Sequence, residues 1–163
     1  MKNLRKIFFM ALLIGIYLQQ SSCNALEYHV VDGDSLEYGT ERIRLNGIDA
    51  PEYLQSCKDQ KGNDYSCGIA AKNHLAELVA NGISCTEQGT DKYGRSLQEC
   101  FLSDGTDINK EMVASGWAVA YGDKYKKEET QAKQARKGIW KGKFMRPELY
   151  RALNGNKQKN KKR

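Results

Sequence analysis

A short stretch of the sequence, residues 42–52, contains side chains that could bind a phosphate and activate a water molecule beside a metal ion. Arg44 carries a guanidinium, which pairs with two phosphate oxygens at once. Asp49 and Glu52 carry carboxylates, which hold a metal ion or accept a proton from water. These side chains stand close together in the sequence, and they predict chemistry on a phosphate ester.

The same stretch predicts how these groups are held in place. Ile43 and Leu45 alternate with Arg44 and Asn46, which is the period of two expected of a half-buried strand. Pro51 follows, and it ends the strand because it has no N–H to donate. The functional groups are therefore expected at the rigid end of a strand.

Two other charged turns belong with this stretch. Residues 32–34 (Asp-Gly-Asp) lie between strand-like segments 26–31 and 36–38, and Asp-Gly in this position is typical of a hairpin. Residues 91–95 (Asp-Lys-Tyr-Gly-Arg) form a turn before another strand. Each turn alone is common in proteins, so the functional interpretation depends on the three segments together.

The pattern of apolar residues and turn residues predicts an α+β domain. The expected strands are 26–31, 36–38, 42–46, 83–87 and 95–102, the expected helices are 67–80, 108–115 and 128–137, and exposed loops are expected at 53–66 and 121–127. This order predicts a five-stranded OB-fold β-barrel with three α-helices packed on it.

The N-terminus is typical of an export signal. Lys2, Arg5 and Lys6 precede an apolar run at 7–18, and small residues follow, so residues 1–25 are expected to be a signal peptide cleaved after Ala25. The alternative of a buried N-terminal helix fits these flanking residues less well.

A second form of signal is also consistent with the sequence. Cys23 follows a small residue after the apolar run, as in bacterial lipoproteins, where the signal would be residues 1–22 and Cys23 would carry a lipid. Gln20 replaces the leucine usual at such sites. Either route exports the protein to a secreted or periplasmic location, and the membrane is an expected partner only if Cys23 is lipidated.

The other four cysteines predict two disulfides. Four cysteines in a small exported domain allow three pairings. The favoured pairing is Cys57–Cys67, which closes a short loop, with Cys85–Cys100, which joins two strands. A zinc site is the alternative, but no CxxC or CxxH spacing supports it.

The net charge of +6 comes from the two ends of the chain. Of the 26 basic residues, 1–25 contain three and 151–163 contain six, with no acidic residue in either segment, which leaves 17 basic and 20 acidic residues in 26–150. The sequence therefore predicts a slightly acidic domain at 26–145 and a basic, disordered tail at 146–163. Such a tail suits a polyanion or an anionic surface, although solvated disorder alone also accounts for it.

In this order and in these strand and turn contexts, the three charged segments resemble the staphylococcal-type nuclease (thermonuclease-like) family. The resemblance extends from about Tyr28 to Trp140. It implies an OB-fold, a calcium requirement, and hydrolysis of DNA and RNA to 3′-phosphates by a monomeric enzyme.

The resemblance also implies a metal site. Asp34 and Asp49 are similar in position to the calcium carboxylates of the family, and the backbone carbonyl of Ala50 would complete the protein ligands. Asp32 corresponds to a second acidic position near the metal. Calcium prefers such hard oxygen donors.

The remaining roles follow from the same resemblance. Glu52 corresponds to the residue that orients or deprotonates the attacking water. Arg44 and Arg95 correspond to two arginines that bind the phosphate, where fixed donors meet the charge of the transition state. Tyr93 corresponds to a residue lining the nucleotide pocket, and Tyr121 is a candidate for a second aromatic wall.

Two other functions remain as alternatives. A catalytically inactive OB-fold module could bind nucleic acid through the same surface, but such a module is expected to lack some of the metal or phosphate residues, which are all present here. The second alternative, a surface-tethered adhesion protein, is supported by Cys23 and the basic tail alone.

Overall fold

The computed structural model describes residues 27–160, and at 155–160 it describes the backbone only. The predicted signal peptide and Cys23 lie outside the described residues. Within residues 27–160, no helix is both long enough and apolar enough to span a membrane.

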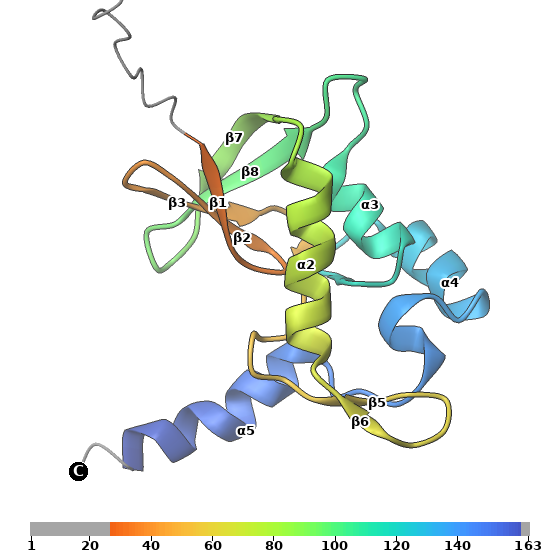
Figure 1. The fold of residues 1–163 in the computed structure, drawn as a ribbon. Helices are drawn as coiled ribbons and strands as arrows, with labels where there is room; N and C mark the ends of the chain where they lie inside the picture. The colour runs from red at the N-terminus through yellow and green to blue at the C-terminus, as the bar shows by residue number, and fades with distance from the viewer. Residues whose placement is uncertain (1–26, 161–163) are drawn as a thin grey trace, which may run out of the picture.

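A five-stranded mixed sheet forms the centre of the fold (Figure 1). Its strands are β1 (Tyr28–Asp32), β2 (Ser35–Tyr38), β3 (Glu41–Leu45), β7 (Ser84–Thr90) and β8 (Ser96–Phe101), in the order β1-β2-β3-β8-β7. The only parallel pair in this sheet is β3–β8, and the other neighbours run antiparallel. All five strands coincide with strands predicted from the sequence, within a few residues at each end.

The predicted closed barrel is not found among the described residues. No ladder joins the edge strands β1 and β7. β1 lies against a helix instead, and most of β7 is exposed to solvent. The α+β class is confirmed, with an open five-stranded sheet at its centre.

Three of the helices were expected from the sequence: α2 (Cys67–Val79), α3 (Ile108–Ala114) and α4 (Lys126–Gln134). Asp107 caps α3 as predicted, since its side chain accepts a hydrogen bond from the Lys110 N–H. A short 3-10 helix, η1 (Gly138–Lys141), follows α4.

The last helix, α5 (Pro147–Asn160), occupies the segment for which a disordered tail was expected. Pro147 at its first position and the i, i+4 pair of Leu149 and Leu153 are the local signals for it. The basic composition of residues 151–163 obscured these signals. In Figure 1, α5 extends away from the sheet at the lower end of α2.

Two short strand pairs complete the fold. β4 (Ile48–Asp49) pairs with β9 (Val119–Ala120), and β5 (Cys57–Lys58) pairs with β6 (Asp64–Tyr65) inside the segment expected to be a loop. The core lies between the sheet and the helices α2 and α3. Its largest fully buried aliphatic side chains are Leu36, Ile43, Leu45, Ile48, Leu75, Ile108 and Met112.

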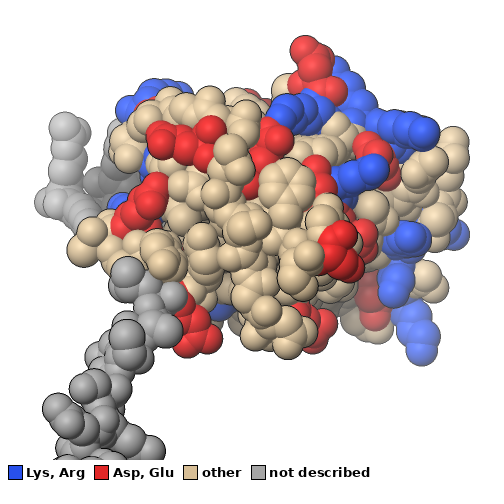
Figure 2. All heavy atoms as spheres, turned by 90° about the horizontal axis from the view of Figure 1, so that it is seen from above, with Lys and Arg blue, Asp and Glu red and all other residues tan. Residues whose placement is uncertain are grey.

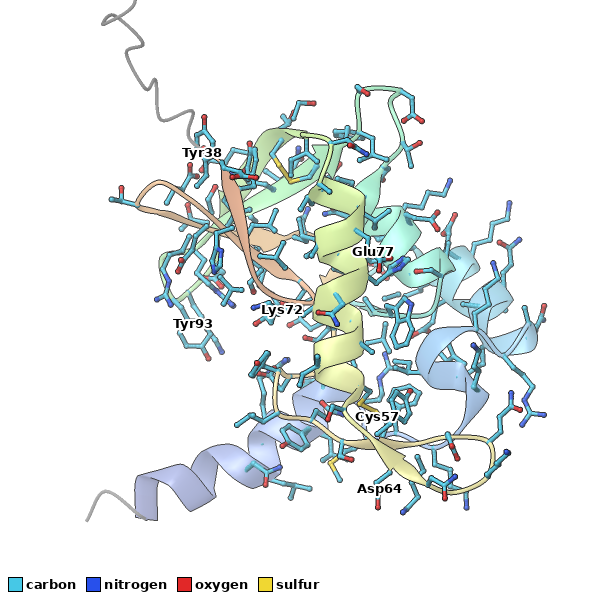
Figure 3. The ribbon with its side chains drawn as sticks, viewed as in Figure 1. Tyr38, Cys57, Asp64, Lys72, Glu77 and Tyr93 are labelled. Carbon is cyan, nitrogen blue, oxygen red and sulfur yellow. A yellow bond between two sulfur atoms is a disulfide. The ribbon has the colours of Figure 1, made fainter. Side chains whose placement is uncertain are left out.

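Two disulfides are present, Cys57–Cys67 and Cys85–Cys100, which is the pairing favoured from the sequence. The first joins β5 to the start of α2, and the second joins directly paired residues of β7 and β8. Figure 3 labels Cys57 at the lower end of α2. Two disulfides in a domain of this size are typical of an oxidising, extracytoplasmic environment.

Candidate active site

Two buried carboxylates, Asp34 and Asp49, form the floor of the site, and each has only 2% of its surface exposed. Asp34 lies in the turn between β1 and β2, and Asp49 ends β4. The Ala50 N–H donates to Asp34 Oδ2 at 2.7 Å. This contact joins the two segments that carry the carboxylates, although fifteen residues lie between Asp34 and Ala50 in the chain.

Gly33 allows this close approach. A Cβ atom at this position would lie 2.7 Å from Ala50 Cβ and 2.8 Å from Ala71 Cβ of α2. The glycine of the Asp-Gly-Asp turn is therefore required by packing as well as by the turn. Asp32 also supports the turn, because its Oδ1 accepts a hydrogen bond from the Asp34 N–H at 3.1 Å.

Arg44 on β3 binds both floor carboxylates. Its guanidinium contacts Asp34 Oδ1 through Nη1, and Asp49 Oδ1 through Nη2 at 2.8 Å. Its side chain is 15% exposed. The arginine predicted to bind phosphate thus stands beside the carboxylates predicted to bind metal, and it neutralises part of their charge.

The environment changes the protonation of this cluster. Burial raises the pKa of Asp34, whereas the Arg44 guanidinium and the Ala50 N–H oppose that rise. The pKa of Arg44 is raised by Asp34 and Asp49, although burial acts in the opposite direction. Arg44 is therefore firmly charged, and although its proximity lowers the pKa of Asp34, burial is the larger effect and the net pKa of Asp34 is raised.

Glu52 lies in a loop that is held rigidly by its backbone. The Gln55 side chain, which is fully buried, accepts a hydrogen bond from the Glu52 N–H at 3.2 Å. The Gln55 N–H donates to the Glu52 carbonyl at 2.7 Å. Gly68 of α2 packs so closely against this loop that a Cβ there would lie 1.9 Å from the Glu52 carbonyl oxygen. The loop is thereby clamped against the start of α2, beside the Cys57–Cys67 disulfide.

Arg95 and Tyr93 come from the turn between β7 and β8. Asp91 organises this turn, because its Oδ1 accepts hydrogen bonds from the N–H groups of Tyr93 and Arg95 at 2.8 and 3.0 Å. The Arg95 guanidinium pairs with Asp91 Oδ2 at 2.7 Å and lies 5.7 Å from the centre of the Tyr93 ring. Tyr93 itself is 71% exposed and is labelled at the edge of the sheet in Figure 3.

Tyr121 lies just after β9. Its N–H donates to the Gly47 carbonyl at 2.9 Å, which places it beside the turn between β3 and β4, and its surface is 58% exposed. Both predicted aromatic residues are therefore available for stacking on a base.

One cleft of about 790 Å³ brings most of these residues together. Its lining includes the predicted residues Asp32, Arg44, Glu52, Tyr93, Arg95 and Tyr121, together with Arg42, Lys92, Glu148 and Arg151. Asp34 and Asp49 lie buried behind this lining, in contact with Arg44. Segments that are far apart in the sequence thus meet at a single site.

Arg151 of α5 is a site residue that the sequence interpretation missed. Its Nη1 contacts Asp49 Oδ1 at 2.8 Å and Glu52 Oε1 at 2.7 Å, and its Nη2 contacts Asp49 Oδ2 at 3.0 Å. No local motif marks this arginine, because it lies in a segment whose composition predicts disorder.

The oxygen donors have the right chemistry for calcium. Asp34 and Asp49 offer carboxylates, and Ala50 offers a backbone carbonyl next to them. However, no three His, Cys, Asp or Glu side chains are grouped closely enough to hold a metal ion in the part of the chain that the structure describes. Guanidinium groups of Arg44 and Arg151 contact the carboxylates instead.

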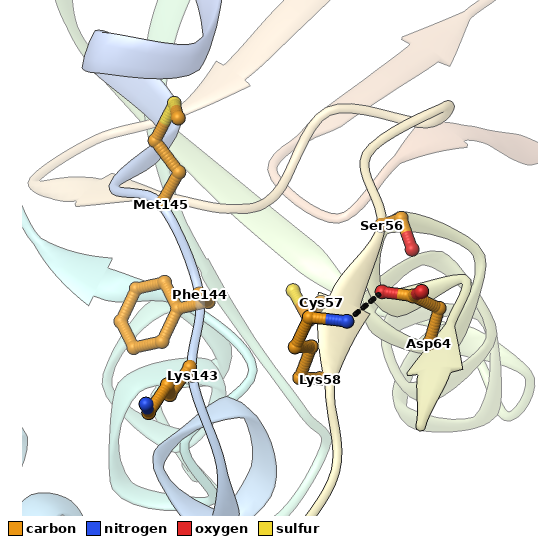
Figure 4. Close-up of a pocket in the computed structure, with 7 residues that line it drawn as sticks. All are labelled: Ser56, Cys57, Lys58, Asp64, Lys143, Phe144 and Met145. Carbon is orange, nitrogen blue, oxygen red and sulfur yellow. Dashed lines mark hydrogen bonds and ion pairs between the residues drawn. The ribbon is translucent and has the colours of Figure 1, made fainter. Parts of the chain in front are cut away.

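The surface has a second hollow away from this cleft. A shallower hollow of about 440 Å³ lies between β5–β6 and residues 143–145, beside the Lys58–Asp64 ion pair (Figure 4). The face seen in Figure 2 carries both acidic and basic side chains.

A cleft that combines arginines, carboxylates and exposed aromatic rings is typical of the class of proteins that bind phosphate-containing ligands. The sequence comparisons make this class specific. Residues 42–142 match the model of the family described as "Staphylococcal nuclease homologue", and the chain belongs to that family.

Several curated relatives agree with this assignment. The chain is 38% identical over 118 residues to the succinoglycan biosynthesis protein ExoI of Rhizobium meliloti, with 69% of this chain and 62% of ExoI aligned. It is 30% identical over 131 residues to the endonuclease YhcR of Bacillus subtilis, with 68% of this chain and 11% of YhcR aligned. An uncharacterized endonuclease of Escherichia coli O157:H7 is 33% identical over 122 residues, with 68% and 72% aligned. The chain thus spans less than two thirds of the first two relatives.

Proposed function

We propose that the protein is an exported, calcium-dependent nuclease that hydrolyses phosphodiester bonds of DNA and RNA and leaves 3′-phosphates. The observation that carries the proposal is the single cleft lined by Arg44, Glu52 and Arg95, with Asp34 and Asp49 directly behind it. The family assignment and the endonucleases among the relatives support the same activity.

The proposed chemistry uses the residues of this cleft. Glu52 accepts the proton of a water molecule whose oxygen attacks phosphorus, the bond to the 5′ oxygen breaks, and the leaving oxygen takes a proton from solvent. Arg95, with Arg44, stabilises the charge on the non-bridging oxygens. Calcium held by Asp34, Asp49 and the Ala50 carbonyl would neutralise phosphate charge and lower the pKa of a bound water.

Two exposed tyrosines are proposed to bind the bases of the substrate. Tyr93 and Tyr121 stand at the cleft with more than half of each residue's surface in solvent, so both rings are accessible for a base to stack on. Stacking does not depend on the identity of the base or of the sugar. This property agrees with a nuclease that accepts both DNA and RNA.

The test is digestion of single-stranded DNA and RNA by wild type, Glu52→Gln and the control Glu77→Gln, each with calcium or with a chelator. Glu77 lies on α2 and does not line the cleft. We expect Glu52→Gln to lower the rate by about 10²–10⁴-fold, the control to retain the wild-type rate, and the chelator to stop hydrolysis. The 3′ ends of the products should accept a label only after phosphatase treatment, whereas the 5′-hydroxyl ends should accept a kinase label directly.

Calcium-independent cleavage, or full activity of Glu52→Gln, would contradict the proposed mechanism. Binding of nucleic acid by all variants without any hydrolysis would favour the inactive OB-fold module instead.

A further inference from the structure

Arg151 forms a cluster of ion pairs at the cleft surface. Its guanidinium meets both oxygens of Asp49, at 2.8 and 3.0 Å, and one oxygen of Glu52, at 2.7 Å. Two-pronged pairs of this kind are the strong form of a charged hydrogen bond. The neighbouring carboxylates raise the pKa of Arg151, so this guanidinium is always positive.

This arrangement puts a positive charge where a divalent cation would bind. Asp49 Oδ1 already contacts Arg44 and Arg151, and Asp49 Oδ2 contacts Arg151. A metal ion that uses Asp49 as a ligand would therefore compete with the Arg151 guanidinium for the same carboxylate oxygens. The same arginine also contacts Glu52, which is the proposed acceptor of the water proton.

We infer that Arg151 is an internal competitor of the divalent cation, and that α5 holds the site in a metal-free, inactive arrangement until a cation displaces this side chain. The inference rests on the proposed function, because it assigns Asp49 to the metal and Glu52 to the water. Arg151 lies outside residues 42–142, the range that matches the nuclease family.

α5 packs loosely against the domain, so displacing this helix costs little free energy. From Glu148 to Asn154, no residue of the helix is buried, and Leu149 and Leu153 are each 52% exposed. Besides the Arg151 ion pairs, α5 contacts the domain through Tyr150, whose Oη donates to the Leu54 carbonyl at 3.3 Å. Once a cation replaces the Arg151 ion pairs, little else holds the helix, so it opens at low free-energy cost.

The entry to α5 is held more firmly than the helix itself. Gln55 Nε2 donates to the Met145 carbonyl at 2.7 Å, and Pro147 is buried. Movement would therefore pivot near residues 145–147, carry Arg151 out of the cleft and leave the Glu52 loop in place.

The first test is calorimetric titration of calcium into the wild-type protein, Arg151→Gln and the control Arg146→Gln. Arg146 contacts Glu129 and the Ala120 carbonyl rather than the floor carboxylates. Because Arg151→Gln lacks the competing guanidinium, it should bind calcium about tenfold more tightly than wild type, which corresponds to about 1.4 kcal/mol. The control should bind calcium as wild type does. Arg151→Lys, which keeps the charge but loses the two-pronged geometry, should lie between them.

The second test uses the wild-type protein alone, so it does not depend on how a variant folds. Hydrogen exchange of the α5 amides should accelerate severalfold when calcium is added, and exchange in β3 and β8 should not. Unchanged exchange in α5 would overturn the inference.

The titration also separates this inference from the proposed function. Equal or weaker calcium affinity of Arg151→Gln, or no calcium binding by either protein, would overturn the competition. If hydrolysis of nucleic acid still occurred, the nuclease function would stand without it.

Discussion

Gln55 offers the most direct test of whether the loop that carries Glu52 positions a reacting group. Its side chain is fully buried, and it links the Glu52 N–H at 3.2 Å to the Met145 carbonyl at 2.7 Å. Gln55→Ala removes both hydrogen bonds and leaves a small cavity. The backbone groups of Glu52 and Met145 then lose these partners.

The expected magnitudes follow from these contacts. Two lost hydrogen bonds cost about 1–3 kcal/mol together, and the cavity adds to that, so the free energy of unfolding should fall by about 2–4 kcal/mol. A displacement of the Glu52 carboxylate by about 1 Å should lower kcat by about 10²-fold. KM should change little, because the arginines proposed to bind phosphate do not touch Gln55.

The assay combines urea unfolding with hydrolysis of single-stranded DNA at saturating calcium, so that altered metal affinity does not enter kcat. Gln98→Ala is the matched control. Gln98 is also a buried glutamine, and its Nε2 donates to Glu41 and Ser96 on another part of the sheet. The control should lose comparable stability and keep its kcat.

The reasoning would be refuted if Gln55→Ala were destabilised and yet hydrolysed DNA at the wild-type kcat. Glu52 would then either not act on the water or not depend on this loop for its position. An equal loss of kcat in the Gln98 control would show that the loss comes from general destabilisation and not from displacement of Glu52.

Two further predictions concern stability. Replacing Cys85 and Cys100 together by serine should lower the free energy of unfolding by about 3 kcal/mol in urea, because this disulfide joins residues 15 apart in the sequence; an unchanged midpoint would contradict this. Burial lowers the pKa of His74 below the ordinary histidine value of 6.5. The unfolded chain therefore binds the extra proton first, and stability should be complete above about pH 6.5 and decline as the pH falls through the lowered pKa. His74→Gln should flatten that decline in thermal melts taken from pH 8 to 5, and an identical decline in wild type and variant would rule out His74 as its source.

The sequence by itself determined the five strands of the central sheet, the helices α2, α3 and α4, and their order. The alternation of Ile43 and Leu45 with polar residues predicts β3, and an apolar stripe closed by Asn81-Gly82 predicts α2. These patterns are local, since side-chain period and capping depend on neighbours within one or two turns. Four cysteines allow three disulfide pairings, and the structure contains the pairing that the sequence favoured.

Much of the candidate site was also readable from local motifs, because each functional side chain sits next to a turn signal. Asp34 follows a turn glycine, Glu52 follows Pro51, and Arg95 ends the Asp91 turn. The structure places these segments around one cleft. Their catalytic roles remain predictions that the proposed experiments test.

Only the tertiary structure decided which charges meet. Arg44 contacts Asp34 and Asp49 together, which no local pattern specifies. Arg151 reaches Asp49 and Glu52 across 102 and 99 residues of sequence. Such contacts depend on how the sheet and α5 are placed in space, and composition alone favoured disorder for the segment that carries Arg151. Residues 42–52 thus predicted the chemistry of the site, whereas the fold supplied the second guanidinium that contacts its carboxylates.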